Sequence, residues 1–97
     1  MPCYFIGEVD VRDAAGYKAY ADAVPAILEK FGGKFLAKGG VTETLEGFAP
    51  QPRIALVEFP DMETARAFWH SPEYRAIAPI RNRTAVARAF LVEGTTP

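Results

Sequence analysis

The sequence predicts an α+β fold, in which one antiparallel sheet carries helices on one of its faces. Three observations predict it: segments rich in β-branched and aromatic residues, segments whose apolar residues recur every three or four positions, and the order of these segments. The chain has 97 residues, of which 49% are hydrophobic. We therefore expect a single domain with its own core over residues 1–97.

Three segments have the composition of strands. They cover residues 4–11, 53–59 and 85–93, and the middle one, RIALVEF, has the strongest β-propensity. In each segment both alternating sets of residues contain apolar side chains. We therefore expect strands that are apolar on both faces of the sheet.

A long amphipathic helix follows the first strand. Asp13 is its expected N-cap, because its carboxylate can accept a hydrogen bond from a free backbone N–H. Pro25 should kink the helix by removing a backbone hydrogen bond. Gly32 and Gly33 end it, since Gly adopts the left-handed conformation without a steric cost. Its apolar stripe consists of Tyr17, Tyr20, Ala21, Val24, Ile27, Leu28 and Phe31.

Two further helices are expected before the last strand. Asp61 caps a helix over residues 62–70. Ser71, followed by Pro72 and Glu73, starts a second, short helix at an angle to the first. The apolar residues of the two helices are Met62, Ala65, Phe68, Trp69, Tyr74, Ile77 and Ile80.

Residues 34–45 admit two interpretations. They form either a hairpin around Gly39 and Gly40 or one strand with a bulge, and the sequence does not decide between them. Residues 46–52 have the Gly and Pro content of a surface loop. Residues 94–97 are expected to be a frayed tail.

The order of the segments suggests the ferredoxin-like β-α-β-β-α-β arrangement. The second face of such a sheet is normally wet, but here it also carries large apolar residues and needs cover. A homodimer that brings two sheet faces together supplies that cover. One face contains Tyr4, Ile6, Ile54, Leu56, Phe90 and Val92, and the other contains Phe5, Val9, Ala55, Val57, Phe59 and Leu91.

Composition argues against several classes of function. The 11 Lys and Arg residues nearly balance the 12 Asp and Glu residues, so nucleic acid and acidic membranes are not expected partners. No apolar run approaches the length of a membrane span. One His and one Cys are too few for a structural zinc site, and a single Cys excludes an intramolecular disulfide. We expect a cytoplasmic protein without a metal.

Several segments together resemble the DUF1330 family, and the resemblance spans nearly the whole chain. They are the first strand, the helix with Tyr17 and Tyr20, GGKFLAKGG at 32–40, LEG at 45–47, VEFP at 57–60 and ARAFWHSPEYRAI at 65–77. The resemblance implies a dimeric α+β barrel, in which two ferredoxin-like protomers face their sheets together and small ligands sit between sheet and helices. It implies a fold and no established catalytic residue.

Relatives of that family in the same superfamily include antibiotic-biosynthesis-type monooxygenases, haem-degrading enzymes, isomerases of small lactones and proteins without known activity. Haem-degrading relatives pair a Trp of the second helix with a haem-ligating His further along. Trp69 fits the first half of this pattern, but residues 73–83 contain no His. We therefore expect no cofactor.

His70 is one candidate catalytic residue, because an imidazole can act as a general base near neutral pH. The alternative is a His that merely stabilises the C-terminal end of its helix. Consecutive helical residues point about 100° apart, so Trp69 and His70 cannot both face the core. We expect Trp69 to be the buried one and, with Tyr74, a wall of the pocket.

Glu8 and Glu58 are the sharper candidates, because strand alternation places each among apolar residues on the face that a partner sheet would cover. Burial and like charge raise carboxylate pKa values, which is how general bases are tuned. Glu58 is the candidate base, and Glu8 a substrate-binding residue. The alternative is that both lie at the rim, solvated or paired with Arg88 or Arg53.

Arg81 and Tyr17 are candidate ligand-binding residues. A guanidinium can bind an anionic substrate at the mouth of a pocket, although most arginines are simply solvated, and a Tyr at helical spacing is usually core. The sequence thus favours binding of a small aromatic or acidic molecule between the helix over residues 62–70 and the sheet. Cofactor-independent oxygenation or isomerisation is the chemistry that we expect there. The alternative is a non-catalytic small-molecule-binding or stress-associated homodimer.

Overall fold

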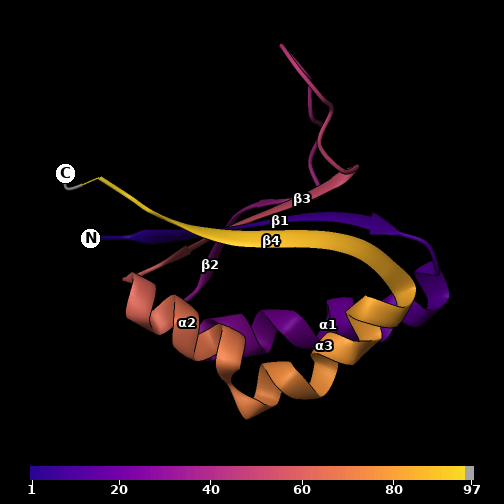
Figure 1. Cartoon of the computed structure of the whole chain (residues 1–97). Helices are drawn as coiled ribbons and strands as arrows, with labels where there is room; N and C mark the ends of the chain where they lie inside the picture. The colour runs from indigo at the N-terminus through magenta and orange to yellow at the C-terminus, as the bar shows by residue number, and fades with distance from the viewer. Residues whose placement is uncertain (96–97) are drawn as a thin grey trace.

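The computed structural model describes residues 1–95 and contains four strands and three helices. Their order along the chain is strand, helix, strand, strand, helix, helix, strand (Figure 1). The elements are β1 (Cys3–Val11), α1 (Ala14–Lys30), β2 (Lys34–Lys38), β3 (Arg53–Phe59), α2 (Met62–His70), α3 (Pro72–Thr84) and β4 (Ala85–Glu93).

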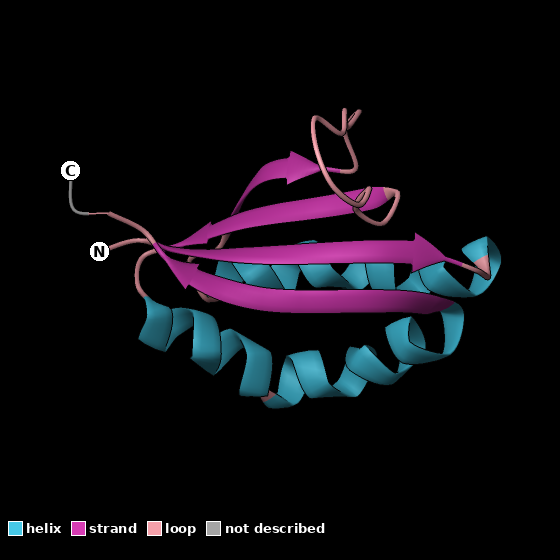
Figure 2. Ribbon diagram, turned by 45° about the horizontal axis from the view of Figure 1, so that its top comes forward, coloured by secondary structure: helices cyan, strands magenta, loops and turns pink. Residues whose placement is uncertain are grey.

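The strands form one antiparallel sheet in the order β2-β3-β1-β4. All three helices lie on the same side of it, which leaves the other side free (Figure 2). The predicted ferredoxin-like α+β fold is therefore confirmed. The register pairs Phe5 on β1 with Val57 on β3 and with Leu91 on β4, so a row of apolar side chains faces the helices.

The helix starts are those that the capping residues predict. The carboxylate of Asp13 accepts from the N–H of Gly16 at 3.0 Å, and that of Asp61 accepts from the N–H of Thr64 at 2.7 Å. The Ser71 hydroxyl accepts from the N–H of Tyr74 at 3.1 Å and donates to the carbonyl of Phe68 at 2.7 Å. Ser71 thus ends α2 and begins α3, which explains the turn between them.

The length of α3 differs from expectation. Instead of a short helix, α3 has 13 residues and runs past Pro79. Its last residue, Thr84, accepts from the N–H groups of Arg12 and Asp13 through its carbonyl, which ties the end of α3 to the start of α1. α1 is continuous over 17 residues, Pro25 included, and the kink at Pro25 stays a prediction.

Both interpretations of residues 34–45 are wrong, because residues 41–45 form no strand. β2 ends at Lys38 and pairs with β3 instead, with an irregularity between Phe35 and Ala37. The Gly39 N–H donates to the Ile54 carbonyl at 2.8 Å, so β3 already satisfies the backbone that a hairpin at Gly39 would use.

Residues 39–52 form a long loop, which we call the arm. It rises from the sheet on the side opposite to the helices (Figure 1). Its apolar side chains Val41, Leu45 and Phe48 are exposed. Of the expected frayed tail, residues 94 and 95 are outside the strands, and residues 96–97 lie outside the described residues.

The face of the sheet opposite to the helices, here called the open face, is also apolar, as predicted. Phe90 and Val92 are 43% and 44% exposed, and Tyr4, Ile6, Ile54 and Leu56 are partly exposed. Within residues 1–95 no helix is long and apolar enough to cross a membrane.

Candidate functional site

A cavity lies between the sheet and α1, and small residues on the sheet help to create it. Gly7 on β1 pairs with Ala55 on β3 and with Ala89 on β4, so this row carries almost no side chain towards the helices. A Cβ atom on Gly7 would lie 3.2 Å from a ring carbon of Phe5. The cavity measures about 50 Å³, and Gly7 and Ala55 form part of its floor.

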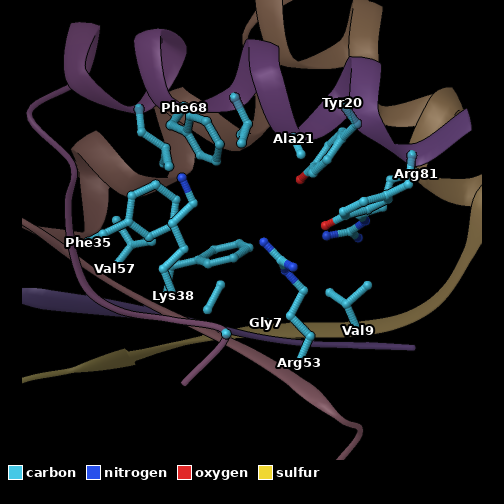
Figure 3. Close-up of a pocket in the computed structure, with 16 residues that line it drawn as sticks. Gly7, Val9, Tyr20, Ala21, Phe35, Lys38, Arg53, Val57, Phe68 and Arg81 are labelled. Atoms are coloured by element: carbon cyan, nitrogen blue, oxygen red, sulfur yellow. The ribbon is translucent and has the colours of Figure 1, made fainter. Parts of the chain in front are cut away.

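The roof of the cavity comes from the helices. α1 contributes Tyr17 and Tyr20, whose rings lie 5.3 Å apart, and α2 contributes Phe68 (Figure 3). The Tyr20 hydroxyl is 3.0 Å from the hydroxyl of Tyr74, which holds the ring of Tyr20 in place. Burial raises the pKa of both Tyr17 and Tyr20, so both phenols are protonated at neutral pH and can donate hydrogen bonds.

Three cationic side chains line the same cavity: Lys38 of β2, Arg53 of β3 and Arg81 of α3. The side chains of Arg53 and Arg81 extend into the hollow from opposite layers, the sheet and the helices (Figure 3). Among residues 1–95 no Asp or Glu lines the cavity. The site therefore combines aromatic walls with positive charge.

Burial of the three cations increases from the surface inwards. Lys38 is exposed, Arg53 is partly buried and Arg81 is only 8% exposed. Gly39, next to Lys38, is exposed as well and has a positive φ of 69°. It lies beside the side chain of Arg53. The mouth of the cavity is thus at the C-terminal end of β2, and Arg81 lies at the buried end.

Comparison with known proteins identifies the family. The model of the domain of unknown function DUF1330 matches residues 2–95. The chain belongs to the DUF1330 family. No curated protein matches it.

Solved structures share the fold of this DUF1330 chain. A protein of unknown function from Rhodopseudomonas palustris is 22% identical over 99% of this chain and 84% of its own, with a TM-score of 0.76. SnoaB, a cofactor-independent oxygenase from Streptomyces nogalater, is 12% identical over 99% and 95%, with a TM-score of 0.69. A dimeric protein of unknown function with a ferredoxin-like fold, from Bacteroides fragilis, is 18% identical over 96% of each chain, with a TM-score of 0.61.

Of the residues that the sequence proposes for the site, the structure brings Tyr17 and Arg81 together in the cavity. Trp69 and His70 line a different hollow of about 230 Å³ between α2 and β4, with Phe5, Arg66, Ala89, Phe90 and Leu91. His70 is exposed there, and Trp69 is half-buried. Tyr74 is fully buried in the core of the DUF1330 fold, where its hydroxyl contacts the hydroxyl of Tyr20.

Glu8 and Glu58 are not brought together. Glu58 pairs with Tyr4 and Glu8 with Ile54, so the two residues are four positions apart along the sheet, a backbone rise of about 13 Å. Strand alternation places both on the open face, away from the cavity. The two carboxylates are therefore not neighbours on the open face.

Glu8 is instead held in its charged form. Its carboxylate pairs with the Arg88 guanidinium and accepts from the N–H of Gln51 at 3.1 Å. These bonds, the one to Arg88 first, lower the pKa of Glu8, although the residue is only 9% exposed. Glu8 thus anchors the base of the arm to the open face, and the alternative of pairing with Arg88 is the one that the structure shows.

Arg53 and Lys38 were missing from the predicted site of this DUF1330 protein. Arg53 had a usable signal, because it lies two and four positions before Ala55 and Val57 and so shares their helix-facing side. Lys38 had none, since its place depends on the pairing of β2 with β3. Within residues 1–95 no three His, Cys, Asp or Glu side chains are close enough to hold a metal ion.

Proposed function

We propose that this protein binds a small aromatic or acidic molecule in the cavity between α1 and the sheet. One observation carries the proposal: the row Ala55, Gly7 and Ala89 leaves room beneath aromatic side chains that would otherwise pack against the sheet. Ligand sites are typically concave and mostly apolar, with a few convergent polar groups. Here those groups are the Tyr20 hydroxyl and the guanidinium groups of Arg53 and Arg81.

Binding without turnover is the function that this cavity supports best. Within residues 1–95 neither a carboxylate nor an imidazole lines it, and its two phenols are protonated because burial raises their pKa values. A general base for proton abstraction has to lie within hydrogen-bond reach of the substrate. Glu58, on the open face, does not meet that condition.

Cofactor-independent oxygenation or isomerisation is the second candidate, and the hollow beside α2 favours it. His70 and Trp69 line this hollow together, so an imidazole base and an aromatic wall face the same space. The fold is shared with SnoaB, which is described as a cofactor-independent oxygenase. The two candidates place the ligand at different ends of the row Ala55, Gly7 and Ala89, which makes them separable.

A matched pair of substitutions separates them. Ala55→Leu fills the floor of the cavity, and Ala89→Leu, in the same row, fills the hollow beside α2. Small molecules that co-purify with the native protein are identified by mass spectrometry and titrated back onto each variant. We expect Ala55→Leu to abolish binding and Ala89→Leu to retain it. The reverse result, together with consumption of the compound and loss of turnover in His70→Gln, would establish the second candidate.

We further propose that the protein is a cytoplasmic homodimer joined through the open face. The exposed Phe90 and Val92, together with Leu56, would cost about 1.5–3 kcal/mol each if left in water. Cys3 is a free, fully buried thiol, which suits a reducing compartment. Cell fractionation tests the location, and the state of association is tested below.

A further inference from the structure

Arg81 is a buried cation without a counter-ion among residues 1–95. It is 8% exposed, it belongs to none of the ion pairs of the described chain, and its Nε atom is buried without a hydrogen-bond acceptor. Its guanidinium carbon lies 5.9 Å from the ring centre of Tyr20 and 5.6 Å from that of Trp69. Aromatic faces offset part of the cost of burying a guanidinium, but they accept no hydrogen bond from Nε in its plane.

A second cation lines the same cavity as Arg81. Arg53 extends into the same cavity from β3, with its guanidinium carbon 5.9 Å from the ring centre of Tyr17. Arginine stays charged in proteins, so two guanidinium groups facing one space repel one another in a medium of low dielectric constant. An anion between them would convert this repulsion into two attractive contacts.

The size of the cavity limits which part of a ligand can enter. An apolar cavity of about 150 Å³ holds a benzene molecule, whereas this cavity measures about 50 Å³. That space fits an anionic head group, and a ring attached to the head group has to lie on the mouth side of the cavity. The body of the ligand then extends towards the mouth at Lys38 and Gly39, past the aromatic walls.

We propose that Arg81 is the anion receptor of this site and that its ligand is a small carboxylic acid. The carboxylate occupies the inner end of the cavity, where it accepts from Nε of Arg81 and from Arg53, and the apolar body extends past Tyr17, Tyr20 and Phe35 towards the mouth. Lys38 attracts the anion at the mouth, so the three cations form a path of increasing burial. This inference rests on the proposed binding function and adds the chemical class of its ligand.

The test compares matched pairs of acids and amides. Benzoate with benzamide, and phenylacetate with phenylacetamide, differ in charge and hardly in shape. Binding is followed by calorimetry and by the rise of the melting temperature, which reports any ligand that binds the folded state only. We expect each acid to bind at least about tenfold more tightly than its amide, because charge-assisted hydrogen bonds are the stronger ones.

Substitutions test whether Arg81 causes the preference for acids over amides. Arg81→Gln should remove the preference for the acid, and Arg81→Lys should keep part of it, since the charge remains and the planar fork is lost. Arg75→Gln is the control, because Arg75 also lies on α3 with its guanidinium carbon 4.7 Å from the Trp69 ring centre, but is exposed and does not line the cavity. It should bind the acids as the unmodified protein does.

The outcomes separate this inference from the function on which it rests. Equal binding of acid and amide, unchanged in Arg81→Gln, would overturn the receptor role while small-molecule binding stands. Tighter binding of inorganic phosphate than of every acid would overturn the proposal that the ligand is a carboxylic acid. Failure of acids, amides and phosphate alike to raise the melting temperature at millimolar concentration would overturn both proposals. If Arg81→Gln does not fold, the acid–amide comparison is made on the unmodified protein and on Arg81→Lys. A preference for acids that is not reduced in Arg81→Lys would then overturn the receptor role of Arg81.

Discussion

The hydroxyl groups of Tyr20 on α1 and Tyr74 on α3 lie 3.0 Å apart, in the interior between the two helices. Their rings meet edge to face at 6.1 Å. The pair satisfies two buried hydroxyls at once, but the two residues are not equivalent. Tyr20 also lines the cavity, whereas Tyr74 is completely buried.

Substitution of either tyrosine should therefore have an unequal effect. Tyr20→Phe leaves the Tyr74 hydroxyl in the core without a partner and should lower the free energy of unfolding by about 1–3 kcal/mol. Tyr74→Phe should cost less, because the Tyr20 hydroxyl still faces the cavity. The double variant should cost less than the sum of the single ones. Denaturant unfolding of all four proteins measures this, and strict additivity would argue that the two hydroxyls do not interact.

Trp69 packs against the core as well as against Arg81. Its ring centre is 5.1 Å from that of Tyr74 and 5.9 Å from that of Phe5. Trp69→Ala should lower the free energy of unfolding by about 3 kcal/mol, at the lower end for large aromatic side chains because Trp69 is only half-buried. Trp69→Phe keeps a ring at this place and should cost clearly less. Equal losses in the two variants would contradict a packing role.

The open face should mediate dimerisation. Leu56→Asp places a charge among its apolar side chains and should convert a dimer into a monomer in sedimentation experiments. Ala26→Asp is the control, because Ala26 is exposed on α1, on the side of the sheet away from the open face (Figure 1). A stable monomer of the unmodified protein at micromolar concentration would refute the proposed interface. So would a Leu56→Asp variant that remains dimeric.

The bond between Glu8 and Arg88 should make stability depend on pH in the acidic range. Because the pKa of Glu8 is lowered in the folded protein, its contribution is present above the unfolded value of about 4.3 and is lost as the pH falls through the folded pKa. Glu8→Gln should therefore be less stable than the unmodified protein at pH 7, with the difference shrinking below about pH 4.

Urea unfolding at both pH values checks this expectation. Glu29→Gln serves as the control, since Glu29 is exposed on α1 and belongs to no ion pair among residues 1–95. A gap between Glu8→Gln and the unmodified protein that is constant with pH would show that the charge of Glu8 does not carry the effect. In that case the hydrogen bond from the Gln51 N–H to Glu8 would stabilise the fold independently of the charge of Glu8.

Much of the fold could be predicted because its signals are local. A cap needs only the residue and the next turn, so Asp13, Asp61 and Ser71 mark their helices correctly. Alternation along β1 and β3 likewise identified two apolar faces. The partner of β2 could not be predicted, because it depends on competition between distant segments for the same backbone groups.

The cavity escaped prediction for the same reason. Gly7, Ala55 and Ala89 are ordinary small residues in three separate segments, and only the register of the sheet places them in one row. The sequence predicted a pocket between the helix over residues 62–70 and the sheet, yet the enclosed cavity lies between α1 and the sheet. Arg81 was a candidate because of its charge. Its burial and its Nε without an acceptor depend on how distant segments pack, which the sequence does not show.

The arm begins and ends where β2 and β3 are still hydrogen-bonded to one another. Lys38 faces Ala55 across the last pair of β2 and β3, and the Gly39 N–H bonds the Ile54 carbonyl beyond it. A short connection could therefore join the two strands, and the entropy of a loop changes only slowly with its length. Residues 40–50 can accordingly be exchanged for a reporter or an affinity peptide without loss of the fold, provided that Gln51 stays to bond Glu8. The segment offers an insertion point on the side of the sheet away from the cavity.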